Sequence, residues 1–312
     1  MLFSGKGGVG KTTMAASFAL SCARRGQRTL LMELDAKDKA GSLFGASEVG
    51  PQIQEIDDNL FVVNTNAKAA MREYALMILK LKFIYRAFFE NRVVSSFLDV
   101  VPGLKELVML GKAYYHATQT DRRGRPVWDK VIVDAPATGH GIFFLKIPAV
   151  ITDLISSGHM YEEAQRILDL LQDPERTGIA LVTLAEDMPV NETLMLSETV
   201  QEEMGLPVAC VIANGIYRPL LDEGEADWVE EARQGEGSDE EVQGLLEAAR
   251  FRADRVALQQ EYLERLRNEG TWPLLEIPYY FFDRMSFAVI DEIADDLEEC
   301  LPEPVESMQS TG

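Results

Sequence analysis

The stretch that decides the fold lies at the start of the chain and reads Ser4-Gly5-Lys6-Gly7-Gly8-Val9-Gly10-Lys11-Thr12-Thr13. It fits the phosphate-loop pattern, in which a glycine, any four residues and a second glycine precede Lys-Ser/Thr. A short apolar segment, 2–4, comes before it and a helical pattern over 14–25 follows. Glycines let backbone N–H groups wrap around phosphate oxygens, and the helix N-terminus adds the positive end of its dipole. We therefore predict that this loop binds the phosphates of a nucleotide.

Three side chains of the loop have predicted roles. Lys11 is expected to contact the β- and γ-phosphates, and Thr12 to offer its hydroxyl to Mg²⁺. Lys6 is a second lysine inside the loop, and Lys11 already occupies the position over the loop's own phosphates. Lys6 is therefore either a solvated side chain or a group that reaches a nucleotide held by a second subunit, as an arginine finger does in trans.

Further along the chain, short aliphatic runs alternate with longer helical patterns. The runs that we interpret as strands are 2–4, 29–34, 60–64, 130–133, 178–184, 208–213 and 274–277. Several are continuously apolar, which is typical of strands buried on both faces of a parallel sheet. This alternation predicts an α/β fold with a doubly wound, mostly parallel sheet, whose ligands bind at the carboxyl ends of the strands. An all-helical pattern over 67–118 predicts a helical insertion in that fold.

Two aspartates follow predicted strands at the edge where the phosphates should lie. Asp35 comes after 29–34 and could orient the attacking water or hold a water bound to Mg²⁺. Asp134 ends a hydrophobic strand, which is the position of a carboxylate held close to Mg²⁺ in phosphate-loop enzymes. The following Thr138-Gly139-His140 would form a loop able to sense the γ-phosphate.

These motifs together resemble a known family. Lys6 to Thr13 match the deviant Walker A form found in a class of dimerising ATPases. Asp134, Thr138, Gly139 and His140 match a second family motif, and Asp35 with Phe44-Gly45 keeps parts of a third. The chain is similar to the arsenite-pump and tail-anchored-protein-targeting ATPases. The resemblance implies ATP and Mg²⁺ as ligands, Asp35 as the residue that activates water, and Lys6 acting across a dimer.

The resemblance extends to later segments. It implies that Asn214, after the strand 208–213, reads the adenine and that Pro278 begins a loop over the base; without the family, Asn214-Gly215 would be read as a simple turn. Glu192-Thr193 matches the start of a family helix. The helices of 67–118 fall where the family binds its clients, so a protein or membrane-protein partner is expected, although methionines and aromatics on a helix also pack into cores.

Departures from the family favour some functions over others. The cysteine pair that binds an intersubunit zinc in one branch is absent from 244–249, so we expect no structural zinc. Cys22, Cys210 and Cys300 are far apart in sequence and suit small hydrophobic roles, which disfavours activation by arsenite. The main interpretation is a homodimer, or a heterodimer with a paralogous subunit. The alternatives are the catalytic subunit of an anion (arsenite-type) efflux pump and a partition or positioning ATPase.

Composition sets the remaining expectations. The 312 residues carry a formal net charge of −21, which disfavours binding to nucleic acid. The sequence contains no apolar run of roughly 18 residues, so membrane insertion is not expected. It also shows no leader pattern, so a cytoplasmic location is expected. We expect a single ATPase domain over 1–302 with a flexible tail, 303–312. Within it, the acidic stretch 222–241 predicts a solvated linker and 247–268 a long helix.

Overall fold

The computed structural model describes residues 1–34, 40–46, 49–79, 103–135, 140–234 and 239–300. Its centre is an eight-stranded sheet with the order β3-β4-β2-β5-β1-β6-β7-β8. The strands are β1 (Leu2–Gly5), β2 (Thr29–Leu34), β3 (Gln54–Asp57), β4 (Leu60–Thr65), β5 (Lys130–Asp134), β6 (Ile179–Leu184), β7 (Val208–Ile216) and β8 (Leu274–Pro278). Every neighbouring pair is parallel except β3 and β4. The predicted α/β fold with a mostly parallel sheet is therefore confirmed.

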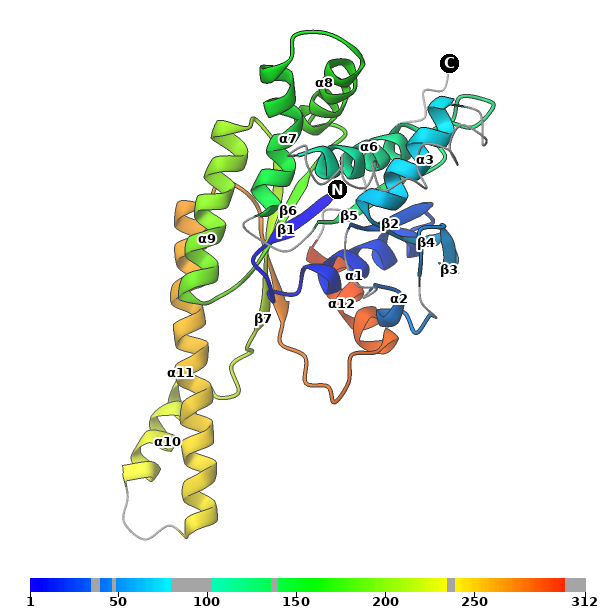
Figure 1. Ribbon diagram of the computed structural model, residues 1–312. Coiled ribbons are helices and arrows are strands. Elements are labelled where there is room, and N and C mark those ends of the chain that lie inside the picture. Colours follow the sequence, from blue (N-terminus) through cyan, green and yellow to red (C-terminus); the bar gives the residue numbers. More distant parts are fainter. Residues whose placement is uncertain (35–39, 47–48, 80–102, 136–139, 235–238, 301–312) are drawn as a thin grey trace, which may run out of the picture.

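Helices cover both faces of the sheet (Figure 1). One face carries α1 (Lys11–Arg24), α2 (Ala40–Leu43) and α12 (Phe287–Cys300). The other carries α6 (Leu104–Thr118), α7 (His140–Leu154), α8 (His159–Gln172), α9 (Asp187–Glu198) with its π-helical extension η1 (Thr199–Glu203), and the end of α11 (Glu240–Glu269). Two large hydrophobic cores, one on each face, hold these layers to the sheet, and a smaller cluster packs Leu263 of α11 against β7.

The central strands are buried from end to end. All six side chains of β2 are buried; Leu30 and Met32 contribute to one core and Leu31 to the other. Because successive side chains of a strand point to opposite faces, a strand covered on both sides is mostly apolar. The buried Glu33 of β2 is an exception, and its Oε1 accepts a hydrogen bond from the N–H of Ala40 at 3.0 Å. Burial on both faces explains the continuous apolar runs of the sequence.

The edge strand β3 was not predicted. Its sequence, Gln-Glu-Ile-Asp, is mostly polar, and its residues alternate between partly buried and exposed. It pairs antiparallel with β4, with an irregularity between Glu55 and Asp57. A short, charged edge strand with a bulge discourages pairing with another chain, and it lacks the apolar pattern that marks the inner strands.

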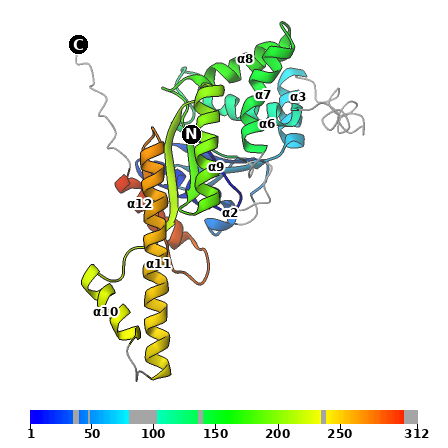
Figure 2. The ribbon, with the colours of Figure 1, turned by 90° about the vertical axis from the view of Figure 1, so that its left-hand side faces the viewer.

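The acidic stretch 222–241 is a correction to the sequence prediction, because most of it is helical. Helix α10 (Glu223–Gln234) packs along α11, and the two extend away from the sheet as a hairpin (Figures 1 and 2). Val229 is buried, and Glu230 forms ion pairs with Arg233 and with Arg250 of α11. Tertiary contacts with α11 thus order a segment whose composition alone favours solvation. Helix α11 also begins seven residues earlier than predicted, where the Asp239 side chain accepts a hydrogen bond from the N–H of Val242 at 3.0 Å.

The predicted helical insertion contains α3 (Ala67–Leu79) and α6, which pack against each other. Residues 80–102 between them lie outside the described part of the chain. Lys112 of α6 joins the two helices, with its Nζ 3.0 Å from a carboxylate oxygen of Glu73. Within the described residues, none of the helices has the length and apolar character needed to cross a membrane.

Candidate nucleotide-binding site

The predicted site residues gather at the carboxyl edge of the sheet. The loop 6–10 joins β1 to α1, and α1 begins at Lys11. Asp134 is the last residue of β5, Asn214 lies in the last third of β7, and Pro278 ends β8. Parallel strands bring their carboxyl ends to one edge, so positions far apart in sequence meet there.

Two glycines of the loop occupy positions that no other residue fits. Gly5 has φ +141°, and a Cβ there would lie 2.2 Å from the carbonyl oxygen of Val182. Gly10, which precedes α1, has φ +97°, and its Cβ would lie 2.4 Å from the side-chain nitrogen of Asn214. The backbone can therefore approach both β6 and β7 closely, and the loop adopts a left-handed turn at the start of the helix.

Lys11, Thr12 and Asp134 place polar groups where the loop meets the beginning of α1. The Lys11 ammonium is buried and donates to the Lys6 carbonyl oxygen at 2.8 Å, so it crosses the inside of the loop. The Thr12 hydroxyl donates to Oδ2 of Asp134 at 2.7 Å, and Asp134 is itself buried. A hydroxyl and a carboxylate thus converge at the beginning of α1, next to a buried cation.

Asn214 connects the loop to the other half of the sheet. Its side-chain nitrogen donates to the carbonyl oxygen of Val9 at 2.9 Å. Beside it lies a cavity of about 380 Å³, whose lining includes Gly8, Gly10, Thr13, Asn214 and Pro278. Loop residues and the predicted base-contacting residues therefore line one continuous cavity, of a size suited to a small ligand.

Helix α11 closes this cavity through Gln259. The Gln259 side chain accepts a hydrogen bond from the N–H of Tyr217 at 2.8 Å and donates to the carbonyl oxygen of Gly215 at 3.0 Å. Both backbone groups lie just beyond Asn214, around the end of β7. Gln259 therefore holds the backbone that carries Asn214 against the long helix.

Aromatic side chains form the outer wall of the cavity. The rings of Tyr217 and Tyr279 lie 4.8 Å apart, and the Arg252 guanidinium sits 4.2 Å from the Tyr217 ring centroid. Tyr280 also lines the cavity and donates a hydrogen bond to Asp296. Burial, followed by this bond, raises the pKa of the Tyr280 phenol above its usual value, so the phenol keeps its proton at neutral pH. Aromatic faces of this kind can stack on a planar base.

Lys6 points away from the interior of the loop. Its Nζ donates to Oε1 of Glu192 on α9 at 2.7 Å, and both side chains are partly exposed. The two lysines of the loop thus lie in different environments, since Lys11 is buried and Lys6 is at the surface.

Several predicted residues lie outside the described part of the chain. Asp35, Thr138 and Gly139 are among them. His140 is the first residue of α7. The roles assigned to these residues remain predictions from the sequence.

The donor set beside the loop fits a magnesium ion. Thr12 and Asp134 offer a hydroxyl and a carboxylate oxygen within hydrogen-bond distance of each other. Mg²⁺ in phosphate-transfer sites prefers oxygen donors, and takes one or two from the protein and the rest from phosphates and water. Over the described ranges, no group of three or more His, Cys, Asp or Glu side chains could hold a metal ion.

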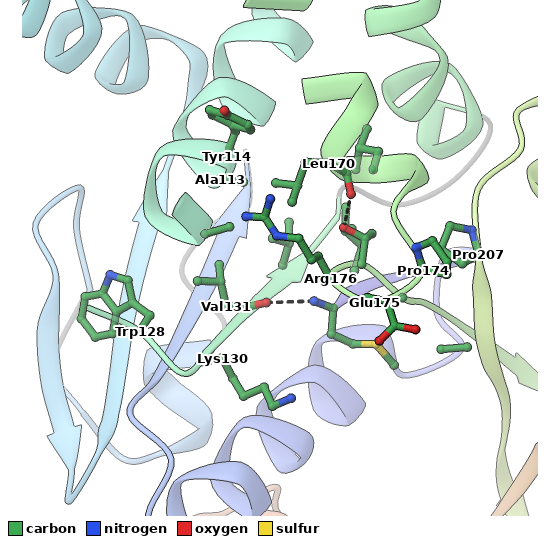
Figure 3. Close-up of a pocket in the computed structure, with 18 of the residues that line it drawn as sticks. Ala113, Tyr114, Trp128, Lys130, Val131, Leu170, Pro174, Glu175, Arg176 and Pro207 are labelled. Atoms are coloured by element: carbon green, nitrogen blue, oxygen red, sulfur yellow. Dashed lines mark hydrogen bonds between the residues drawn. The ribbon is translucent and has the colours of Figure 1, made fainter. Parts of the chain in front are cut away.

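A second cavity, of about 570 Å³, lies at the opposite edge of the sheet (Figure 3). Its wall includes Trp128, Lys130 and Arg176 from segments around the amino ends of the strands, and the Met1 amine donates to the carbonyl oxygen of Val131 at 3.0 Å. Burial lowers the pKa of this amine to about 6. Since ligands of doubly wound folds bind at the carboxyl ends, this cavity is separate from the candidate site.

The cysteines lie on three different elements. Cys22 of α1 and Cys210 of β7 are buried, as predicted for small hydrophobic residues, and burial raises their pKa values to about 11 and about 12. Cys300, at the end of α12, is exposed rather than buried, which corrects the prediction for that residue.

Sequence reasoning did not predict three contacts of the site. The ion pair of Lys6 with Glu192 joins residues 186 positions apart, so no local pattern announces it. The Gln259 contacts and the position of Tyr217 likewise depend on how α11 crosses the end of β7. For the ion pair, the sequence offered one signal, the match of Glu192-Thr193 to the start of a family helix.

Comparison with known proteins agrees with this geometry. The model of the family described as anion-transporting ATPase matches residues 1–158 and 152–238. The ATPase BagA of Mycobacterium tuberculosis H37Rv is 30% identical over 298 residues, covering 89% of this chain and 86% of the relative. The arsenical pump-driving ATPase of Acidiphilium multivorum is 26% identical over 243 residues, covering 73% of this chain but 40% of the relative. One from Escherichia coli is 25% identical over 232 residues, covering 69% and 39%. The chain therefore belongs to the anion-transporting ATPase family and is an ATP hydrolase.

Proposed function

We propose that the chain hydrolyses ATP with Mg²⁺ in a site completed by a second subunit, and that hydrolysis switches a helical surface that binds a protein partner. The observation that carries the proposal is the arrangement of Lys11, Thr12 and Asp134 beneath a phosphate loop. In that arrangement Lys11 contacts the β- and γ-phosphates, and Thr12 with Asp134 holds Mg²⁺, which neutralises phosphate charge during transfer. Asp35 orients the attacking water.

The base-binding end of the site is formed by Asn214, Pro278 and the aromatic wall. The Asn214 amide can both donate to and accept from the edge of an adenine. Because its nitrogen already contacts the Val9 carbonyl, recognition of the base is coupled to the position of the loop. The proposed ligand is therefore a complete nucleotide spanning the loop and the cavity of about 380 Å³.

The two environments of the loop lysines support a second subunit. Lys11 already crosses the interior of the loop, whereas Lys6 extends outward at the surface. A cation in that position can reach a nucleotide bound to a facing subunit, where it would stabilise the charge that develops on the transferred phosphoryl group. In a C2 dimer, each subunit would supply its Lys6 to the nucleotide of the other subunit.

The connection from the site to a partner surface runs through α7. This helix begins at His140, six residues after Asp134, and packs against α6 and α8. Loss of the γ-phosphate removes contacts that hold one arrangement of the loop after Asp134, and the shift would pass to α7 and α6. The helical insertion is thus placed to respond to hydrolysis, and a membrane protein is the proposed client.

Replacement of Lys11 tests the enzymatic part. We expect Lys11→Ala to lower ATP turnover by at least about a hundredfold, because the cation on the transferred phosphate is lost. Lys146→Ala is the matched control, since Lys146 pairs with Glu203 on the surface outside the site. Phosphate release measured on both variants checks this, and turnover in Lys11→Ala equal to that of the control would refute the assignment.

The partner is tested by capture. Asp35→Asn, incubated with ATP, should hold the triphosphate form and retain its client. Membrane proteins among the retained chains, absent when ADP replaces ATP, support the proposal. Recovery of only water-soluble proteins, or of nothing, would contradict the membrane-protein client.

A second candidate function is the catalytic subunit of an anion efflux pump, which the names of the more distant relatives favour. It predicts that arsenite raises ATP turnover. This chain covers about two fifths of those relatives, and its buried Cys22 and Cys210 lie on different elements. Turnover with and without arsenite separates the two candidates.

A further inference from the structure

The contact between Lys6 and Glu192 is a feature that the proposed reaction does not use. Lys6 Nζ lies 2.7 Å from Glu192 Oε1, with relative exposures of 29% and 47% for the two side chains. A lysine that must reach another subunit is therefore held by an acidic side chain of its own subunit.

Both ends of this ion pair are fixed by other contacts. The Lys6 carbonyl oxygen accepts the Lys11 ammonium at 2.8 Å, which holds the loop at this residue. On α9, Thr193 is buried, and the Asn191 side chain accepts a hydrogen bond from Arg265 of α11 at 2.6 Å. The carboxylate of Glu192 is thus presented to the loop from an anchored helix.

We propose that Glu192 is a positioning residue that restrains Lys6 in the separate subunit and releases it when a partner's nucleotide arrives. This inference rests on the proposed action of Lys6 in trans. A triphosphate carries several negative charges and Glu192 carries one, so the facing nucleotide attracts the ammonium more strongly. Dimerisation therefore has to break the ion pair on each subunit. A pair without nucleotide gains nothing in return, and a singly loaded pair gains only one of the two lysine–phosphate contacts.

The expected effect is modest, because the pair is partly exposed. Ion pairs of this kind contribute about a two- to fivefold change in an equilibrium constant. Since a dimer releases two lysines, Glu192→Gln should lower the dimer dissociation constant by about four- to twenty-five-fold in Mg²⁺ and a non-hydrolysable ATP analogue. Glu198→Gln is the matched control, because it removes the same charge from the same helix away from the loop.

The test is sedimentation of wild type, Glu192→Gln, Glu198→Gln, Lys6→Gln and the double variant Lys6→Gln/Glu192→Gln with the analogue. A tighter dimer for Glu192→Gln alone, with no effect of Glu192→Gln in the Lys6→Gln background, supports the inference. The double variant separates release of Lys6 from a general loss of negative charge.

Three other outcomes overturn it in different ways. A wild-type chain that stays monomeric with the analogue overturns the action of Lys6 in trans, and with it the restraint. A dimer whose dissociation constant is the same in Glu192→Gln and Glu198→Gln overturns the restraint alone. A weaker dimer in Glu192→Gln would show that Glu192 is itself an intersubunit contact.

Discussion

At the scale of single residues, the phosphate loop depends on glycines for two reasons. The sequence motif predicts that backbone N–H groups need freedom to turn, and the positive φ of Gly10 agrees with this. The motif does not predict that Gly10 also leaves room for the Asn214 side chain, which arrives from β7. The sequence therefore predicted the backbone conformation that the loop needs, but it did not predict the contact between the loop and the distant strand β7.

Gly10→Ala should weaken nucleotide binding by about tenfold or more, because the new methyl displaces Asn214 and the turn becomes strained. Gly26→Ala is the control: Gly26 also has a positive φ, but a Cβ there meets no atom within 4 Å. It should cost about 1 kcal/mol of stability and leave affinity unchanged. Titration of a fluorescent ATP analogue checks this, and equal affinities for the two variants would contradict the proposed contact.

The cysteines give a prediction from their pKa values. Burial raises the pKa of Cys22 to about 11 and that of Cys210 to about 12, so neither forms thiolate near neutral pH. Cys300 is exposed. In the native protein at pH 7.5 (roughly neutral), a maleimide should therefore label Cys300 alone, whereas all three thiols react in denaturant. Mass spectrometry of the labelled protein measures this. Rapid labelling of the native Cys300→Ser variant would contradict the burial of Cys22 and Cys210.

At the scale of elements, the apolar pattern of the sequence predicted the inner strands, but it did not predict the elements that are ordered by contacts with other parts of the chain. The seven predicted strands are present, and their largely apolar sequences reflect burial in the sheet, which is complete for the inner strands β1 and β2. The polar edge strand β3 and the acidic helix α10 escaped prediction, since β4 and α11 supply the contacts that order them. Similarly, the sequence predicted a long helix at 247–268 but not that its middle closes the nucleotide cavity.

Gln259→Met should weaken nucleotide binding by about five- to a hundredfold. The variant keeps the size of the side chain but leaves the Tyr217 N–H and the Gly215 carbonyl without their partner, at a cost of about 1–3 kcal/mol. Gln260→Met, the neighbouring position, is the control. Calorimetry with an ATP analogue measures both, and an unchanged dissociation constant for Gln259→Met would show that α11 does not support the base site.

At the scale of the whole molecule, the sheet collects site residues from four strands and one long helix. Lys11, Thr12 and Asp134 were predicted from motifs that follow or end recognisable strands, whereas Asn214 and Pro278 were predicted from the resemblance to the family. Their convergence around one loop and one cavity required the strand order, which places β5, β1, β6, β7 and β8 side by side. The ion pair of Lys6 with Glu192 came from the structure alone.

In the proposed mechanism Lys6 serves the nucleotide of the facing subunit, and a mixture of two inactive variants tests this role. Lys6→Ala and Asp35→Asn should each hydrolyse ATP very slowly. In a mixed dimer, the Lys6→Ala subunit keeps its own Asp35 and receives Lys6 from its partner, so one site is complete. Random mixing at equal concentrations should restore about a quarter of wild-type turnover. Mixtures no more active than the separate variants, although mixed dimers form, would contradict action in trans.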